Sequence, residues 1–372
     1  MFRRSPSFLT ASTSLFVKRR FSVTARLTTD RQSDPAVHEI HGPVDVNTFR
    51  RIAVCGPERP LVLRSQAMSG SDNGTHDAAP PVVLPALGKW FLASEQEARL
   101  SPYFTQHLPH PVPYELLFSP STDPSSSTSN SARFLRWLSS SETPSYKALH
   151  SLLQDAIHAQ PTHGSQDTRF IRFDAPLALL HAALEFNRCQ SLSDRRLSQL
   201  YIAQALLPDL PHELQLDVPT PQLLTAPPTP QLPWSADVYG SSIWIGLEPT
   251  YTPWHRDPNP NLFCQLNSSK VIRLMPPRAG ERLFKKVMAG LGAVRGSAAI
   301  RGEEMMQGAE RRAWLDAVWG PDTPAGMLEV VLHPRDVLFF HKGWWHSVKS
   351  MGESGALNAS VNWWFRWRAH SR

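Results

Sequence analysis

From Trp234 onward the chain consists of short apolar runs rich in β-branched and aromatic residues, each bounded by Pro, Gly or Asn. Short runs at such spacing predict an antiparallel β-sandwich or β-barrel. The expected strands are Ser242–Leu247, Leu262–Leu266, Lys270–Leu274, Leu328–Leu332, Val337–Phe340 and Ala359–Arg366. A charged, helix-prone stretch at residues 280–319 separates two groups of these runs, and it predicts a helical insertion in the β-structure.

The chain before Trp234 has helical spacing instead. One apolar stripe follows the i, i+3, i+4, i+8 pattern of a one-faced helix and is formed by Leu149, Leu152, Leu153 and Ile157. A second helix is expected up to Phe186, with Asp174 as its N-cap and Pro176 in its first turn. We therefore expect a helical region over residues 33–233 that packs on a barrel formed by residues 234–372.

Low-complexity segments separate these elements. Residues 65–81 and 119–131 are dominated by Ser, Thr, Pro, Asn, Gly and Asp, which predicts surface loops. Residues 219–233 are Pro-rich and read as an extended connector between the helical region and the barrel.

The excess of positive charge is confined to the N-terminus. The formal net charge is +6, from 38 Lys and Arg against 32 Asp and Glu. Residues 1–32 hold seven basic side chains and one acid, so the remaining residues are neutral overall. A neutral body has no global field that would draw it to DNA, and no DNA partner is expected.

Residues 1–32 are rich in Ser, Thr and Arg, nearly free of acids, and mix apolar with basic residues. This composition predicts an amphipathic mitochondrial transit peptide and a location in the mitochondrial matrix. The alternative is a disordered basic tail on a nuclear or cytoplasmic protein. No apolar run is long enough to span a membrane. Three cysteines are too few and too scattered for a disulfide framework or a Cys-based zinc cluster.

A candidate metal site begins with His255 and Asp257. On a strand, residues i and i+2 project from the same face, so the imidazole and the carboxylate can reach one ion. A His-x-Asp pair on its own also occurs for structural reasons. A second segment, Asp336–Val348, predicts a strand, a Gly-containing turn and His346 at the start of the next strand. This second histidine completes the two-His, one-carboxylate ligand set of non-haem Fe(II) oxygenases.

These motifs, in this order, resemble the jumonji-C (JmjC), cupin-like family of Fe(II)- and 2-oxoglutarate-dependent oxygenases. The resemblance covers roughly Trp234–Trp367 and extends loosely upstream to Leu200. It is similar to the hydroxylase-like branch that includes the asparaginyl hydroxylase of hypoxia-inducible factor and the tRNA wybutosine hydroxylase. The fold that it implies is mainly β with helices: a double-stranded β-helix, or jelly roll, preceded by a helical N-terminal region.

The resemblance also implies a role for each site residue. His255, Asp257 and His346 match the three iron ligands and thereby the catalytic residues. Lys270 matches the lysine that binds the distal carboxylate of 2-oxoglutarate, and Thr252 matches the hydroxyl that shares it. Two further co-substrate positions are matched by Asn261 and Asn362. In each case an ordinary strand or turn role is the alternative.

This sequence departs from the family pattern at two positions. Trp254 stands where Leu is more usual, and its larger ring is expected to narrow access to the metal. His341 replaces a common Pro, and we expect it to face away from the site.

The implied activity is hydroxylation of a protein side chain or an RNA base, with dioxygen and 2-oxoglutarate consumed and succinate and CO₂ released. Histone methyl-lysine demethylation is the alternative within the same chemistry. It is weakened by the neutral body, the absence of a zinc-binding Cys cluster and the N-terminal leader. A catalytically silent cupin-like scaffold and a zinc-dependent cupin isomerase are the alternatives from other classes. The scaffold has no need for the metal and co-substrate residues, and the isomerase would use more His ligands.

Overall fold

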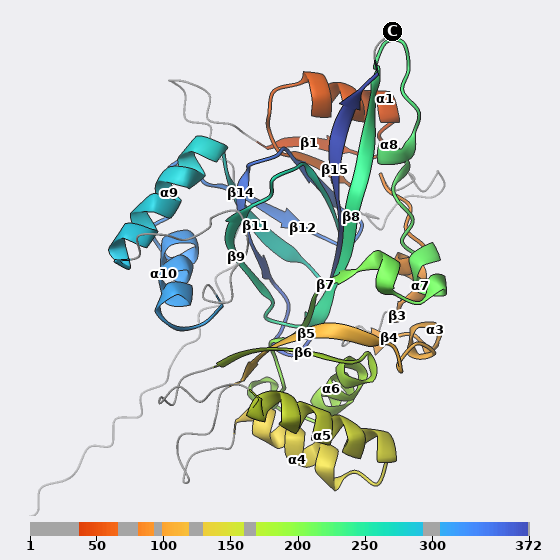
Figure 1. Ribbon diagram of the computed structural model, residues 1–372, viewed down its shortest axis with the longest axis vertical. Coiled ribbons are helices and arrows are strands. Elements are labelled where there is room, and N and C mark those ends of the chain that lie inside the picture. The colour runs from red at the N-terminus through yellow and green to blue at the C-terminus, as the bar shows by residue number, and fades with distance from the viewer. Residues whose placement is uncertain are drawn as a thin grey trace, which may run out of the picture. The chain divides into compact units, whose positions relative to one another are not determined.

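Eight strands, four in each of two antiparallel sheets, build a jelly-roll barrel (Figure 1). The computed structural model describes residues 37–65, 81–92, 99–118, 129–159, 169–292 and 306–370, all within one compact unit, Pro35–Arg372. One sheet contributes β8 (Trp234–Leu247), β10 (Asn261–Asn267), β13 (Val337–Phe340) and β15 (Leu357–Ala369). The other contains β9 (Tyr251–Arg256), β11 (Lys270–Met275), β12 (Leu328–Leu332) and β14 (Trp345–Ser350). The predicted jelly roll is confirmed, and each predicted run of residues lies in a strand.

Side chains that point inward from the strands fill the barrel. On β11, Lys270, Ile272 and Leu274 point inward and are buried, while the residues between them are partly exposed. Apolar side chains from both sheets meet in one cluster: Val62, Phe263, Ile272, Leu274, Val330, Leu332, Leu338, Phe340, Trp344 and Val348. A buried lysine in this apolar interior is unusual, because desolvating an ammonium group is costly.

The larger sheet extends beyond the jelly roll to nine strands among the described residues. Its order is β1-β2-β13-β10-β15-β8-β7-β5-β6. The added strands are β1 (His38–His41), β2 (Leu61–Arg64), β5 (Pro111–Phe118), β6 (Arg169–Pro176) and β7 (Leu200–Leu206). Two short strands, β3 (Phe91–Leu92) and β4 (Arg99–Leu100), pair separately. The region before the barrel therefore supplies strands as well as the expected helices.

One predicted helix start is wrong. Asp174 is not an N-cap but lies in β6, opposite Pro113 of β5. The helix α6 (Ala178–Arg188) begins after Pro176, with Leu177 as its N-cap residue. Cross-strand pairing with β5 keeps Asp174 extended, and this tertiary contact outweighs the local capping signal.

Three helices pack together beside β5 and β6, namely α4 (Asn130–Ser140), α5 (Pro144–His158) and α6 (Figure 1). The predicted stripe on α5 is confirmed: Leu149, Leu153 and Ile157 are buried, and Leu152 is half-buried. The shorter helices are α1 (Val46–Arg50), α2 (Ala86–Lys89), α3 (Pro102–Thr105), α7 (His212–Leu216) and α8 (Gln222–Thr225). Single turns are η1 (Arg51–Cys55), η2 (Ser193–Arg195) and η3 (Leu207–Asp209).

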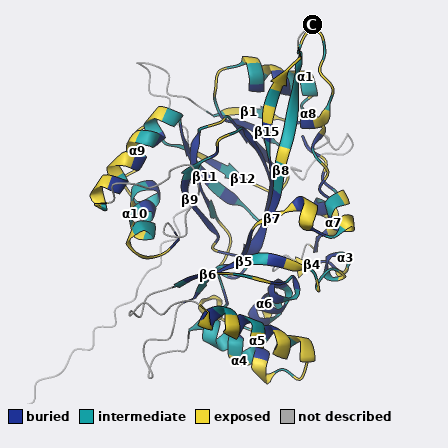
Figure 2. Ribbon diagram, in the orientation of Figure 1, coloured by how far each residue is buried: buried dark blue, intermediate teal, exposed yellow. Residues whose placement is uncertain are grey.

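The stretch between β11 and β12 holds α9 (Pro277–Gly290) and α10 (Gly308–Trp319), which lie beside the smaller sheet (Figure 1). Phe284 of α9 and Trp314 of α10 pack against Trp254 and Trp345 of that sheet. Figure 2 shows α9 with exposed residues along the side away from the barrel. This aromatic cluster fixes the helices to the back of the strands that carry the candidate metal ligands.

Three expectations concern residues outside the described ranges: the leader at 1–32, most of the loop at 65–81 and most of the loop at 119–131. Among the residues that are described, no helix has both the length and the apolar character needed to cross a membrane.

Candidate metal centre and co-substrate cavity

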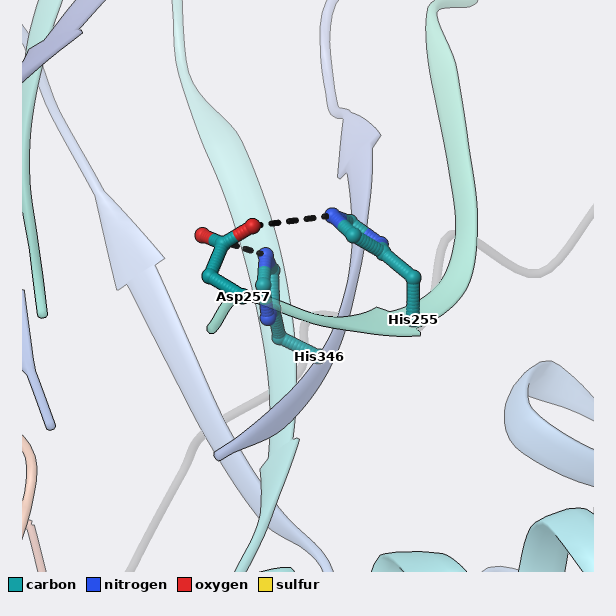
Figure 3. A group of neighbouring side chains, drawn as sticks. All are labelled: His255, Asp257 and His346. Carbon is teal, nitrogen blue, oxygen red and sulfur yellow. Dashed lines mark ion pairs between the residues drawn. The ribbon is translucent and has the colours of Figure 1, made fainter. Parts of the chain in front are cut away.

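His255 and His346 are brought face to face by strand pairing. They are register partners on the neighbouring strands β9 and β14, and their ring centroids are 4.1 Å apart. Asp257 follows the end of β9 and projects toward both rings (Figure 3). The i, i+2 spacing and the long-range closure expected from the sequence therefore place the three side chains at one point.

Both histidines present the same nitrogen to Asp257. The Nδ1 atom of each ring lies against the carbonyl oxygen two residues earlier: Pro253 O at 2.8 Å from His255 and Trp344 O at 3.2 Å from His346. A carbonyl can only accept, so Nδ1 of each ring carries a proton and Nε2 is the nitrogen left for a metal ion. Each Nε2 lies 3.9 Å from an oxygen of Asp257, and the ligand atoms are all within 4.8 Å of one another (Figure 3).

The electrostatic environment of the three side chains favours binding of a cation. Burial, reinforced by the nearby His255 ring, lowers the pKa of His346 well below its usual value, so its imidazole is neutral near pH 7. Two imidazoles and one carboxylate on one side of a site suit a non-haem Fe(II) ion. The residues present therefore fit the metal that the fold implies.

Two hydrogen-bond donors fix the orientation of the Asp257 carboxylate. Asn261 Nδ2 and Trp364 Nε1 each donate to Oδ2 of Asp257, both at 2.9 Å. Asn261 in turn accepts a hydrogen bond from Asn362 Nδ2 at 3.2 Å, and Asn362 accepts one from Trp244 Nε1 at 2.7 Å. Such partners orient metal ligands and tune their basicity. Asn261 and Asn362 thus connect the carboxylate to the strands of the larger sheet.

One cavity is lined both by these groups and by Lys270. All seven residues singled out in the sequence line it: Thr252, His255, Asp257, Asn261, Lys270, His346 and Asn362. Its remaining lining is aromatic or aliphatic: Tyr201, Trp244, Phe263, Ile272, Phe340, Val348 and Trp364. A largely apolar cavity with a few convergent polar groups is the usual form of a small-ligand site.

Lys270 places a buried amine inside this cavity. Its side chain is 1% exposed, and Nζ donates to Ser360 Oγ at 2.6 Å and to Tyr201 OH at 3.2 Å. Burial lowers the pKa of Lys270 from 10.5 to about 7, although the charge of Glu248 opposes the shift. Both of these hydrogen-bond partners are neutral hydroxyls, so a bound carboxylate would restore the charged form of Lys270.

The distance between Lys270 and the candidate metal-binding residues limits the shape of a molecule that could bind in the cavity. On β11, Leu274 is the register partner of His346, and Lys270 lies four residues away, about 13 Å along the strand. Lys270 reaches back into the same cavity. A molecule that contacts both ends must therefore be elongated and carry an anionic group at its distal end.

Several residues that line the cavity or bind Lys270 were not predicted from the sequence. Ser360 and Trp364 share the inward face of β15 with Asn362, so period-two alternation from Asn362 would have found them. Tyr201 and Trp244 come from β7 and β8, and their place beside Lys270 and Asn362 depends on strand pairing across the large sheet. No local signal marks these two residues.

The two departures from the family pattern lie off the cavity. The expected narrowing by Trp254 is wrong: the ring alternates to the outer face of β9, where it is fully buried and stacks on Trp345 at 6.0 Å. His341 faces away as expected, and its ring packs at 4.9 Å from Phe339.

Comparisons with known proteins agree with this geometry. The family described as "Cupin-like domain" matches residues 154–371, more than half of the chain. The chain is 24% identical over 180 residues to lysine-specific demethylase JMJ31 of Arabidopsis thaliana, covering 46% of this chain and 29% of that protein. It is 25% identical over 175 residues to lysine-specific demethylase JMJ30 of the same plant, covering 46% and 34%.

An animal protein matches over a similar span. Jumonji C domain-containing protein 5 of Drosophila melanogaster is 28% identical over 168 residues, 44% of this chain and 36% of the relative. The matched region thus spans about a third of the length of these curated relatives.

Proposed function

The chain belongs to the cupin-like (JmjC) domain family of 2-oxoglutarate oxygenases, and from that premise we propose that it is an Fe(II)-dependent dioxygenase that hydroxylates a protein side chain or an RNA base. One observation carries the proposal. A two-His, one-carboxylate group and a fully buried lysine line the same cavity. A silent scaffold would have no need to bury Lys270 at a cost in solvation.

The proposed division of labour follows from the contacts. His255, Asp257 and His346 would hold the iron, whose chemistry when bound is the activation of dioxygen. Lys270 would bind the distal carboxylate of 2-oxoglutarate by a charge-assisted hydrogen bond, with Ser360 and Tyr201 fixing the ammonium group. Thr252 lines the cavity and is buried, which suits the expected role of its hydroxyl on the same carboxylate.

The cavity walls have a separate task. Phe263, Phe340 and Trp244 are each less than a tenth exposed and keep bulk water from the reacting groups. Exclusion of water strengthens the electrostatic contacts inside the cavity and suppresses side reactions. The overall reaction converts substrate, dioxygen and 2-oxoglutarate into hydroxylated substrate, succinate and CO₂.

Histone methyl-lysine demethylation is the second candidate, favoured by the names of the two plant relatives. The two candidates differ in what leaves the enzyme. Hydroxylation keeps one oxygen atom from dioxygen on the product, whereas demethylation removes a methyl group as formaldehyde.

The test supplies full-length protein with Fe(II), 2-oxoglutarate and heavy-oxygen-labelled dioxygen. The substrates are a mitochondrial protein extract, total RNA and trimethylated histone peptides, each in a separate reaction. Mass spectrometry that finds heavy oxygen on a side chain or base, in wild type but not in His255→Ala, supports hydroxylation. Formaldehyde from the histone peptides, without labelled protein or RNA, would replace hydroxylation by demethylation. Absence of succinate in all three reactions would favour the silent scaffold.

A further inference from the structure

A two-stranded ribbon, formed by β8 and β15, extends the wall of the metal cavity outward (Figure 1). Successive strand residues point to opposite faces, so Trp364 and Arg366 share one face. Phe365, between them, is fully buried in the core on the other face. Because Trp364 lines the cavity, its face of the ribbon continues from the cavity lining to the exposed Arg366.

An irregularity in the ribbon presents a tyrosine on this surface. Trp364 pairs with Gly240 and Phe365 pairs with Val238, which leaves Tyr239 as an extra residue. Such β-bulges re-aim a side chain and are frequent beside active sites. Tyr239 is 46% exposed, and its hydroxyl accepts a 2.9 Å hydrogen bond from Asn259 Nδ2. Asn259 lies two residues after Asp257, so Tyr239 is tied to the loop that carries a candidate metal ligand.

Arg366 is held over this tyrosine with its charge uncompensated. Its guanidinium carbon lies 4.8 Å from the centroid of the Tyr239 ring. The cross-strand neighbour of Arg366 is Asp237, yet Asp237 forms its ion pair with Arg368 instead. Within the described ranges, no carboxylate lies within ion-pair distance of Arg366. The ribbon thus presents an exposed, oriented cation two residues along β15 from Trp364, which lines the cavity.

We propose that Tyr239, Asn259 and Arg366 form a docking ledge that binds an acidic side chain of a protein substrate. The inference rests on the proposed function and specifies its substrate class. An Arg guanidinium binds a carboxylate through two parallel hydrogen bonds, and the exposed Tyr ring offers a flat surface to the adjoining chain. Arg366 lies about 7 Å beyond Trp364 along β15, so the acidic residue stands roughly two to four positions from the modified one.

Charge favours a peptide over RNA on this ledge. Single-stranded RNA binding relies on a groove with several basic side chains along the backbone. Here the next basic residue on the face, Arg368, is already paired with Asp237. The chain beyond residue 32 is neutral overall. A single unpaired guanidinium suits one carboxylate better than a run of phosphates.

The test selects binders from a randomised peptide library with full-length wild type and two variants, Arg366→Gln and the double variant Arg368→Gln/Asp237→Asn. Wild type is expected to enrich Asp or Glu at one position. Arg366→Gln should reduce that enrichment about tenfold, as expected for loss of a charge-assisted contact. The double variant removes the neighbouring ion pair as a unit, so that Asp237 is not freed to compensate Arg366, and it should keep the enrichment. Tyr239→Ala should weaken the selected peptides, which separates the ledge from simple surface charge.

A fluorescein-labelled oligouridine and a 2-oxoglutarate titration complete the experiment. No acidic enrichment, or equal losses in both arginine variants, would overturn the ledge, while 2-oxoglutarate binding by wild type would leave the oxygenase proposal standing. Oligouridine binding that is lost in Arg366→Gln, without peptide selection, would overturn it in favour of RNA. Peptide selection that depends on Arg366 in a protein that binds no 2-oxoglutarate would support the ledge and reject the oxygenase proposal.

Discussion

Lys270 shows how a residue that is unfavourable for the fold can serve a site. Its ammonium group lies in an apolar barrel with two neutral hydroxyl partners, and burial lowers its pKa to about 7. The folded state therefore disfavours the charged form at neutral pH. A bound carboxylate reverses this preference, so ligand binding and protonation of Lys270 are coupled.

This coupling predicts a pH-dependent affinity for 2-oxoglutarate. The protonated fraction of Lys270 is high below pH 7 and falls as pH rises, so binding weakens with increasing pH. Between about pH 6.5 and pH 8.5 the dissociation constant should rise roughly twentyfold for a pKa near 7. Calorimetry on metal-saturated protein measures it. Lys270→Arg, which stays charged throughout, should show no such rise; equal pH slopes in both proteins would contradict the account.

Trp364 donates a hydrogen bond to Asp257 and would act on a bound metal through that carboxylate. Trp364→Phe removes the indole N–H, so Oδ2 of Asp257 loses one of its two hydrogen-bond donors and keeps only Asn261. Loss of such an orienting contact is expected to weaken Fe(II) binding about tenfold. Anaerobic Fe(II) titration measures the affinity. Trp367→Phe is the matched control, since Trp367 packs with Phe49 and Phe365 on the opposite face; an equal loss there would refute the orienting role of Trp364.

At the scale of elements, helix α9 is positioned by close contact with the ligand-bearing strand. A Cβ at Gly280 would lie 2.2 Å from Cγ of Trp345, the residue next to His346. Only glycine lets the helix backbone approach this indole. The aromatic cluster of Trp254, Trp345, Phe284 and Trp314 then continues outward between sheet and helices.

Gly280→Ala should therefore cost about 1–3 kcal/mol of unfolding free energy, because the helix or the indole must move to relieve the overlap. Gly290 lies at the other end of α9 with no atom within 4 Å of an added Cβ. Gly290→Ala should leave stability unchanged or raise it by about 0.5–1 kcal/mol. Urea unfolding compares the two. Similar destabilisation by both substitutions would show that α9 is not packed as closely as described.

The sequence predicted the elements whose signals are local. His255 and Asp257 share a face through strand spacing, and the predicted apolar runs of the barrel lie in strands. The strands β5 and β6 were not predicted. They are stabilised by pairing of β5 with β6 and with β7, and this long-range pairing leaves no local pattern in the sequence. Asp174 gave a helix-capping signal that pairing with Pro113 overrides. Tyr201 reaches Lys270 only through the pairing of β7 with β8.

At the scale of the whole molecule, the excess positive charge and the candidate site lie in different parts of the sequence. Residues 1–32 carry the entire positive excess, and the neutral remainder contains the barrel and its cavity. This division is expected when a basic leader serves transport and the body serves a reaction.

Transport is predicted to depend on that leader. A fluorescent fusion of the full chain should enter mitochondria, and a fusion lacking residues 1–32 should not, because the amphipathic basic segment is removed. Fluorescence microscopy with a mitochondrial marker compares the location of the two fusions. A full-length fusion found in the nucleus would contradict the leader and strengthen the case for histone demethylation.

The iron and co-substrate site is tested most directly by an anaerobic visible-absorbance titration of the purified full chain. Fe(II) is added first and 2-oxoglutarate second. The convergence of His255, Asp257 and His346 with Lys270 predicts a metal-to-ligand charge-transfer band that His346→Ala abolishes. No band in the wild type, together with no 2-oxoglutarate binding by calorimetry, would contradict the oxygenase assignment and leave the barrel as a binding scaffold.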